Sequence, residues 1–194
     1  MRIYNSDCSS PIILASPHSG KLYPEFYKRN LRTSFDYCRS IEDMYVDELI
    51  YNSKSLGISI LINDYSRAVF DVNRDITEID ESLIEVHESF EVSKTLKVKS
   101  GIGLIPIQTP QGKIEFVNKF KKNELTFLID KIYRVWHSNL QQLINLKVKE
   151  LGKAFIVDCH SMPSDFSGSF KIPDIVLGNC NNKSCKNEIL NFLK

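Results

Sequence analysis

The apolar positions of the chain follow two patterns that alternate along the sequence. Short continuous apolar runs indicate buried β-strands, whereas apolar residues that recur every three or four positions indicate amphipathic helices. The strand-like runs occupy residues 11–15, 58–63, 68–72 and 154–157. The helix-like stretches occupy residues 42–55, 117–151 and 184–194. Because strands and helices alternate, the pattern favours an α/β architecture.

Cap and turn residues set the expected ends of the helices. Ser40 is a suitable N-cap for the first helix, which then carries Glu42 and Asp43 in its first turn. Gly57 follows the end of this helix, and Gly152 follows the end of the longest one.

Two further segments have a predicted place in the framework. Residues 76–111 combine mixed periodicity and many charges with several Gly and Pro residues, so we expect an excursion that forms part of a pocket wall. The run 154–157 is expected to be a central strand. Its C-terminal end is where open α/β sheets place their ligand sites.

Length and composition indicate one domain over residues 1–194. With 194 residues, 42% of them hydrophobic, the chain can bury one sizeable core. Its 25 Lys and Arg residues nearly balance 24 Asp and Glu residues, so no broad field favours nucleic acid or an anionic membrane. No apolar run approaches the roughly 18 residues that span a bilayer, and the first residues lack a signal-peptide stretch. We therefore expect a cytoplasmic protein whose partner is a small molecule.

The five cysteines indicate reduced thiols rather than a disulfide framework, because their number is odd and their spacing fits no small disulfide scaffold. Cys180 and Cys185 could supply half of a structural zinc clip. No second Cys or His pair follows them, which disfavours this alternative.

Two histidine motifs each follow an apolar, strand-like run. His18 lies in Ser-Pro-His-Ser-Gly, and His160 lies in Val-Asp-Cys-His-Ser, where Asp158 and Ser161 can orient the imidazole by hydrogen bonds. Two histidines and a carboxylate can hold a catalytic zinc ion and leave a fourth position for water. The alternative for each histidine alone is a hydrogen-bonded structural role. We expect such a role for His87 and His137.

The third ligand is expected to be a carboxylate from the segment between the two histidine motifs. Glu42, Asp43 and Asp47 are the candidates. Asp43 is preferred, because Glu42 is explained as a helix-start charge favoured by the helix dipole. Asp47, one turn further on, either supports the site or is solvated.

A cationic cluster surrounds the run at 68–72. Arg67, Asn73 and Arg74 can present forked donors to a substrate carboxylate, and Asp71 can hold one guanidinium in place. The alternative is an ordinary network of structural salt bridges at a strand end.

Six short motifs occur in the order seen in N-formylglutamate amidohydrolases, and together they span almost the whole chain. Besides the two histidine motifs, they are Glu-Asp at 42–43 with Asp-Glu-Leu at 47–49, Ser-Arg at 66–67 with Asp-Val-Asn-Arg at 71–74, Gly-Ile-Gly-Leu-Ile-Pro at 101–106, and Pro-Asp-Ile-Val-Leu-Gly at 173–178. The chain thus resembles this family, which is itself similar to zinc carboxypeptidases in fold and site design. The resemblance implies a three-layer α/β/α domain around a mixed, mainly parallel sheet.

The resemblance also implies an activity and a set of site residues. It implies one zinc ion, held by His18, Asp43 and His160. It further implies hydrolysis of N-formyl-L-glutamate, or a related anionic N-acyl amino acid, to formate and L-glutamate. The residues that it places on the substrate carboxylates are Arg67, Asn73 and Arg74.

The chain departs from the family pattern at its C-terminal end. The resemblance implies a general-base glutamate on a late strand, which is expected beyond Lys194, because Glu188 falls in a predicted helix. The usual C-terminal part is thus expected to be missing, which would expose a sheet edge and favour self-association or a complementing C-terminal fragment. Two alternatives stay open: a non-catalytic metal-binding or amino-acid-binding remnant, and a zinc carboxypeptidase-like peptidase.

Overall fold

The computed structural model describes residues 1–7, 9–85, 90–163 and 173–193. The chain divides into two compact units, Met1–Ser161 and Met162–Lys194. The first unit contains the sheet, the long helix and both histidine motifs.

A four-stranded mixed sheet forms the centre of the first unit. Its strand order is β1 (Arg2–Tyr4), β3 (Ser59–Ile62), β2 (Ile12–Ser16) and β6 (Phe155–Asp158). Strand β2 runs parallel to both β3 and β6, whereas β1 is antiparallel to β3. The expected α/β fold with a mixed sheet is therefore confirmed, as are three of the four predicted strands.

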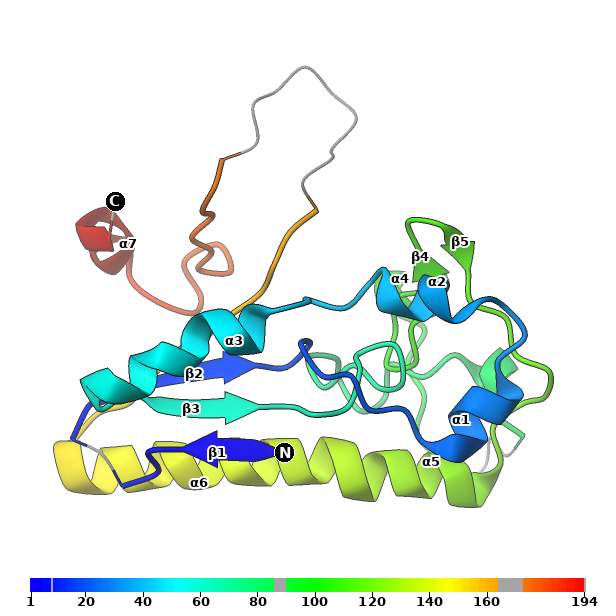
Figure 1. Ribbon diagram of the computed structural model, residues 1–194, viewed down its shortest axis with the longest axis horizontal. Coiled ribbons are helices and arrows are strands. Elements are labelled where there is room, and N and C mark those ends of the chain that lie inside the picture. The colour runs from blue at the N-terminus through cyan, green and yellow to red at the C-terminus, as the bar shows by residue number, and fades with distance from the viewer. Residues whose placement is uncertain (8, 86–89, 164–172, 194) are drawn as a thin grey trace. The chain divides into compact units, whose positions relative to one another are not determined.

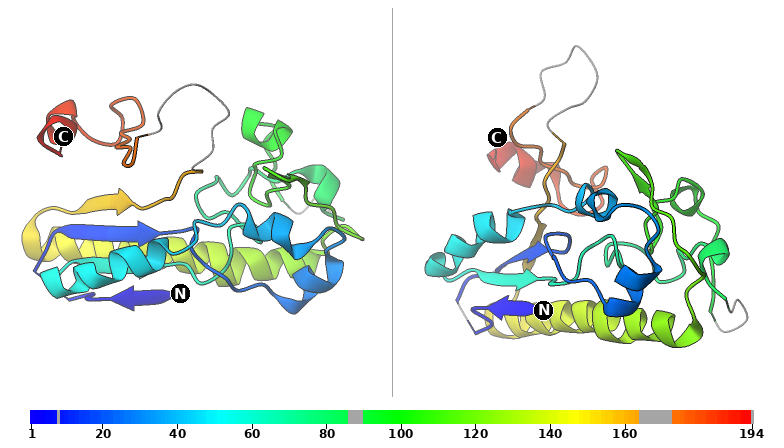
Figure 2. Two further views of the ribbon diagram at one scale, coloured as in Figure 1. Left: turned by 45° about the horizontal axis from the view of Figure 1, so that its top comes forward. Right: turned by 45° about the vertical axis from the view of Figure 1, so that its right-hand side comes forward.

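Helices cover both faces of this sheet. Helix α3 (Val46–Tyr51) lies over one face and the long helix α6 (Arg134–Leu151) over the other, as the two views together show (Figures 1 and 2). All residues of β3 are buried, which explains why this strand is a continuous apolar run rather than an alternating one. The sheet is thus sandwiched between helical layers.

The long helical stretch begins later than predicted. Helix α5 (Lys122–Leu128) continues through the π-helical turn η3 (Ile129–Tyr133) into α6. It begins after Lys121, whose backbone N–H donates a hydrogen bond to the Glu124 carboxylate at 2.8 Å. Gly152 ends the helix as expected, in the left-handed conformation with φ of 72°.

The first predicted helix also begins later than expected. Helix α3 starts at Val46 rather than at residue 42, and Ser40 instead ends the short helix α2 (Phe35–Arg39). The chain turns at Tyr45, which has φ of 68°, and the backbone N–H of Asp43 donates to the His18 carbonyl at 3.1 Å. This tie to the loop after β2 keeps Asp43 out of the helix. The helical stretch closes through the 3-10 helix η1 (Asn52–Leu56) at Gly57, as predicted.

The predicted strand at 68–72 is wrong. These residues are buried, but they form turns, with Val69 N–H bonded to the Ser66 carbonyl at 3.0 Å. The backbone N–H of Asp71 donates to the Leu104 carbonyl at 2.8 Å instead of joining a ladder. An apolar run reports burial, and here the burial comes from a tightly packed loop.

Strand β6 is not central in the described sheet, contrary to the prediction. It pairs with β2 and forms the edge of the sheet, and its side chains at Phe155, Ile156 and Val157 are 45%, 47% and 47% exposed. The sequence pattern does not distinguish a central strand from an edge strand, because the same apolar run can pair along one edge or along both.

The remaining elements of the first unit are short. They are α1 (Glu25–Asn30), η2 (Glu81–Leu83), α4 (Leu96–Lys99), β4 (Gln108–Thr109) and β5 (Gly112–Lys113). Residues 76–111 are mostly irregular in their described part, so the predicted excursion is confirmed.

The second unit contains helix α7 (Asn187–Leu193), which confirms the last predicted helix. The Asn179 side chain organises the preceding turn, because its amide donates to Asn182 at 2.7 Å and to Asn187 at 3.1 Å. The cysteines within the described residues are free thiols. Across the same residues, no helix combines the length and apolarity needed to cross a bilayer.

Candidate metal centre

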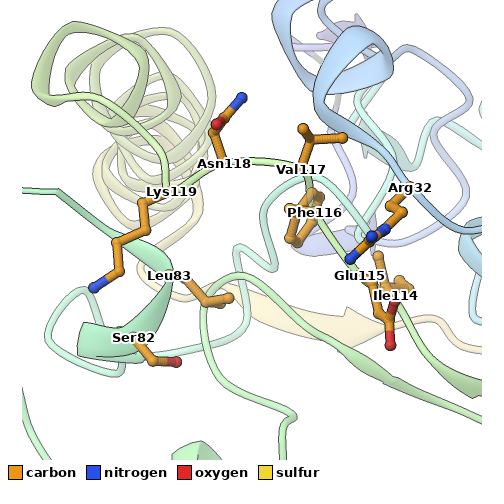
Figure 3. Close-up of a pocket in the computed structure, with 9 residues that line it drawn as sticks. All are labelled: Arg32, Ser82, Leu83, Ile114, Glu115, Phe116, Val117, Asn118 and Lys119. Atoms are coloured by element: carbon orange, nitrogen blue, oxygen red, sulfur yellow. The ribbon is translucent and has the colours of Figure 1, made fainter.

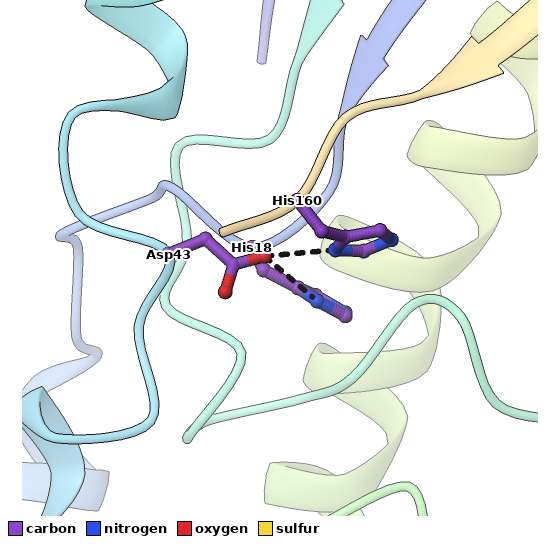
Figure 4. Close-up of side chains that lie close together, drawn as sticks. All are labelled: His18, Asp43 and His160. Atoms are coloured by element: carbon purple, nitrogen blue, oxygen red, sulfur yellow. Dashed lines mark hydrogen bonds and ion pairs between the residues drawn. The ribbon is translucent and has the colours of Figure 1, made fainter. Parts of the chain in front are cut away.

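Three side chains from separate loops converge at one edge of the sheet. His18 follows β2, His160 follows β6, and Asp43 lies in the loop before α3 (Figure 4). Because β2 and β6 are adjacent and parallel, the loops after them leave the sheet at the same edge. One candidate ligand atom from each of the three residues lies within 4.8 Å of the other two.

The Asp43 carboxylate lies between the two imidazoles. Its Oδ2 is 2.8 Å from His160 Nδ1 and 3.6 Å from His18 Nδ1, and the ring centroids are 4.8 Å apart. His18 and Asp43 are buried, whereas the His160 side chain is 36% exposed. His18 and Asp43 therefore form the buried part of the cluster, and solvent reaches the cluster beside His160.

The unpartnered nitrogen of His18 shows that this cluster fits a metal ion. His18 Nδ1 is buried without a hydrogen-bond partner, while Nε2 bonds to Asp71 Oδ1 at 2.7 Å. The bond to Asp71 places the ring proton on Nε2 and leaves a lone pair on Nδ1. Metal-binding histidines commonly have this arrangement, in which a carboxylate accepts the proton of the nitrogen that does not bind the metal. A cation beside Asp43 would satisfy this buried atom.

The charges in the cluster hold one another in place. Burial alone would raise the pKa of Asp43, but the hydrogen bond from His160 and the positive charge of His160 lower it well below its usual range. His160 forms hydrogen bonds with Asp158, which has the larger effect, and with Asp43. These bonds raise the pKa of His160 to about 9. Without a metal ion, His160 is therefore protonated at neutral pH.

The predicted neighbours of His160 contact the cluster. Asp158 Oδ2 lies 2.9 Å from His160 Nε2, and the Ser161 hydroxyl donates to Asp43 Oδ1 at 3.2 Å. The Asn73 amide donates to Asp158 at 2.6 Å, a contact that was not predicted from the sequence. No local signal could have found it, because 85 residues separate the two.

Asp71 joins the histidine cluster to the cationic cluster. Besides His18, its carboxylate accepts from Arg67 Nη2 at 2.8 Å and lies 3.9 Å from Arg74 Nη2. Burial would raise the pKa of Asp71, but the hydrogen bond from His18 and the charges of Arg67 and Arg74 lower it well below its usual range. Asp71 thus holds the Arg67 guanidinium, as expected, and also the His18 ring.

The two arginines differ in how far their donors are used. Arg74 Nε donates to the Ile102 carbonyl at 2.7 Å, which ties this side chain to the 101–106 loop. Arg67 Nε is buried and has no hydrogen-bond partner. Of the residues predicted to receive a substrate carboxylate, Arg67 therefore retains a free donor, whereas the Asn73 amide is bonded to Asp158.

The other candidate carboxylates point elsewhere. Glu42 forms an ion pair with Arg39 at 2.8 Å and accepts a hydrogen bond from the Tyr23 hydroxyl. Asp47 is buried rather than solvated, and it pairs with Arg2 at 3.0 Å. Asp43 is thus the carboxylate of this segment that joins the cluster. His87 lies outside the described residues.

Gly20 allows the loop after β2 to approach its neighbour closely. A Cβ at this position would lie 2.3 Å from the Tyr65 carbonyl oxygen, whereas one at Gly178 would meet nothing within 4 Å. We expect Gly20→Ala to lower the free energy of unfolding by about 1–3 kcal/mol and to weaken metal binding through His18. Denaturant titration checks this, with Gly178→Ala as the control. Equal effects of the two substitutions would contradict the close-approach argument.

A separate pocket of about 370 Å³ lies away from this cluster (Figure 3). It is lined by residues 114–119, by Ser82 and Leu83, and by Arg32. None of the clustered histidines or aspartates lines it, so it plays no part in the chemistry described here.

Fold and cluster together define an α/β protein with a histidine–aspartate centre suited to a metal ion, placed at the C-terminal ends of parallel strands. The chain belongs to the N-formylglutamate amidohydrolase family, whose sequence profile matches residues 10–194. The resemblance carried by the six motifs is therefore confirmed.

Individual relatives are distant in sequence. An N-formylglutamate deformylase from Pseudomonas putida is 25% identical over 181 residues, which cover 90% of this chain and 61% of that relative. The crystal structure of an N-formylglutamate amidohydrolase from Ralstonia eutropha JMP134 is similar in fold, with a TM-score of 0.83 at 24% identity, over 94% of this chain and 67% of that one. A gene product from Agrobacterium tumefaciens has a TM-score of 0.61 at 16% identity, over 88% of this chain and 59% of that one. The chain thus spans about three fifths of the length of the curated relative.

Proposed function

We propose that this protein is a zinc-dependent amidohydrolase that cleaves the amide bond of N-formyl-L-glutamate, or of a related N-acyl amino acid. The observation that carries the proposal is the buried, unpartnered Nδ1 of His18, which faces Asp43 beside His160. Membership of the family and the name of the Pseudomonas putida relative support formate and L-glutamate as the products.

Each residue of the site has a task in this proposal. His18, Asp43 and His160 would hold zinc, which would polarise the amide carbonyl and lower the pKa of a bound water. Asp71 fixes the His18 tautomer, and Asp158 orients His160. The spare donor of Arg67 supports a role for that guanidinium in binding a substrate carboxylate.

The direct test measures zinc binding and hydrolysis separately. Zinc is titrated into the metal-free protein, and release of formate from N-formyl-L-glutamate is then followed with one equivalent bound. We expect stoichiometric zinc and zinc-dependent turnover. Failure to bind zinc would overturn the proposal, and release of C-terminal residues from peptides would point to a carboxypeptidase-like activity instead.

A non-catalytic binding domain is the second candidate. It is favoured by the fact that the candidate metal-binding group found among the described residues consists of His18, Asp43 and His160 and includes no glutamate. Stoichiometric zinc without turnover on any N-acyl amino acid would support this candidate.

Zinc binding is expected to release about one proton per ion at pH 7. His160 must lose its proton to become a ligand, and its pKa is raised to about 9. The zinc affinity should therefore rise about tenfold per pH unit up to about pH 9 and then level off. Calorimetry in buffers of different ionisation enthalpy measures the released proton.

Cys159 supplies the control for this measurement. Burial, aided by Asp158, raises the pKa of its thiol to about 11, so the thiol would release a further proton if it were a ligand. Cys159→Ser should leave proton release unchanged. A zinc affinity independent of pH between 6.5 and 8 would contradict the assignment of His160.

A further inference from the structure

Two side chains of the continuous helical stretch η3–α6 bond to the loop that supports the metal centre. The Tyr133 hydroxyl donates to the Arg74 carbonyl at 3.1 Å, and His137 Nε2 lies 3.0 Å from the Val72 carbonyl. The ring nitrogen is the donor in the second contact, because a carbonyl oxygen only accepts. The two rings also pack together, with their centroids 4.3 Å apart.

The two carbonyls belong to Val72 and Arg74, which alternate along the chain with two residues that contact the metal centre. Segment 71–74 carries Asp71, which bonds to His18 Nε2 at 2.7 Å. It also carries Asn73, whose amide nitrogen lies 3.3 Å from His160 Nε2. Segment 71–74 therefore contacts both histidines through its side chains and bonds to the helical stretch η3–α6 through its carbonyls.

The same segment is held on its other side by the 101–106 loop. Asp71 N–H donates to the Leu104 carbonyl at 2.8 Å, and Arg74 Nε donates to the Ile102 carbonyl at 2.7 Å. Without the helix contacts, the Val72 carbonyl would lose its bond to His137. A metal site needs its ligand distances within about 0.2 Å of their usual values, so even a small shift of this loop would weaken binding.

The π-helical turn sets the register of these side chains. A π-helical turn rotates the residues that follow it relative to a continuous α-helix, and such turns occur frequently at functional sites. Turn η3 ends at Tyr133, and His137 follows one helical turn later on the same face. Tyr133 also packs edge-to-face against buried Phe70, with ring centroids 6.2 Å apart, which fixes the direction of its hydroxyl.

We propose that Tyr133 and His137 are positioning residues that fix segment 71–74 through its backbone carbonyls and thereby align His18 and His160 in the metal centre. The inference rests on the proposed function in one respect, namely that the cluster holds zinc. It assigns neither residue a contact with substrate or metal.

The test uses substitutions that remove the two hydrogen bonds with little loss of packing. Tyr133→Phe removes only the hydroxyl, and His137→Leu removes the ring donor. His137→Gln keeps an N–H near the same place and serves as the rescue variant. Lys131→Ala, at an exposed position of the same π-helical turn, is the control.

Zinc affinity is measured by competition with a chromophoric chelator, and the unfolding transition of each variant is recorded beside it. The Tyr133→Phe/His137→Leu double variant is expected to bind zinc about tenfold more weakly than the unaltered protein. The variant that combines Tyr133→Phe with His137→Gln should regain most of this loss, and Lys131→Ala should lose none.

A second readout follows His18 in the metal-free protein. Long-range ¹⁵N spectra of the histidine side chains report the Nε2–H tautomer that Asp71 imposes, and the double variant is expected to show a mixture of tautomers. If the unaltered protein binds no zinc, the proposed function fails. If it binds zinc and the double variant matches it in affinity and in the His18 spectrum, the positioning role is overturned while the proposed function stands.

Discussion

Asp43→Asn is expected to lower the zinc affinity at least about a hundredfold, because it removes the anionic ligand and leaves two imidazoles. The Asp43 carboxylate lies between His18 and His160, at 3.6 Å and 2.8 Å from their Nδ1 atoms. An asparagine keeps the size and one oxygen but loses the charge that attracts the cation. Zinc affinity, followed by chelator competition, measures the loss.

Asp47 provides a matched control for this substitution. It is buried, as Asp43 is, but it lies four positions later and pairs with Arg2 rather than with the histidines. Asp47→Asn should affect the stability of the fold and leave zinc binding within about twofold of the unaltered protein. If both variants bind zinc equally well, Asp43 is not a ligand.

Asp71→Asn is expected to destabilise the protein by about 3–5 kcal/mol, because it leaves two guanidinium groups without their buried counter-charge. Asp71 is fully buried, and the side chains of Arg67 and Arg74 are 22% and 17% exposed. The substitution also removes the acceptor that orients His18, so zinc affinity should fall about 10–100-fold. Denaturant unfolding and chelator competition measure the two effects.

The contribution of ionised Asp71 to the free energy of unfolding depends on pH, because the pKa of Asp71 is lowered in the folded protein. A carboxylate whose folded pKa is depressed stabilises the fold above the unfolded value of about 3.9, and this stability is lost as the pH falls below it.

Asp130→Asn is the control for Asp71→Asn, because the ion pair of Asp130 with Arg134 is solvent-exposed. It should cost no more than about 0.5 kcal/mol. An equally small effect of Asp71→Asn would contradict the role of Asp71 in joining the two clusters.

Local sequence patterns predicted the framework but not the loops. Three apolar runs became strands, and Gly57 and Gly152 ended helices where expected, because burial and left-handed caps are local properties. The run at 68–72 was equally apolar, yet it forms turns, because its partner is the Leu104 carbonyl rather than another strand. The choice between a strand and a buried loop depends on contacts that no local pattern contains.

The site could be predicted in part for the same reason. Histidines placed just after two strands indicated a shared sheet edge once those strands proved to be parallel neighbours. The bond from His160 to Asp43 crosses 117 residues, and these two side chains were expected to meet as ligands of one metal ion. The bond from His18 to Asp71 crosses 53 residues and was not predicted, because Asp71 was expected to hold a guanidinium. The sequence also placed Asp43 in a helix, whereas its backbone bond to His18 holds it in the preceding loop.

Strand β6 forms one edge of the described sheet, and its side chains Phe155, Ile156 and Val157 are exposed. Self-association through this edge, or its pairing with a complementing fragment, stays a prediction. Gel filtration over a range of concentrations tests it, because association through an exposed strand depends on concentration.

Anomalous diffraction at the zinc edge, from crystals of the loaded protein, locates the ion directly. We expect one strong peak about 2.0–2.2 Å from an imidazole nitrogen of His18, an imidazole nitrogen of His160 and a carboxylate oxygen of Asp43. A peak beside Cys180 and Cys185, with none at the histidines, would contradict this assignment.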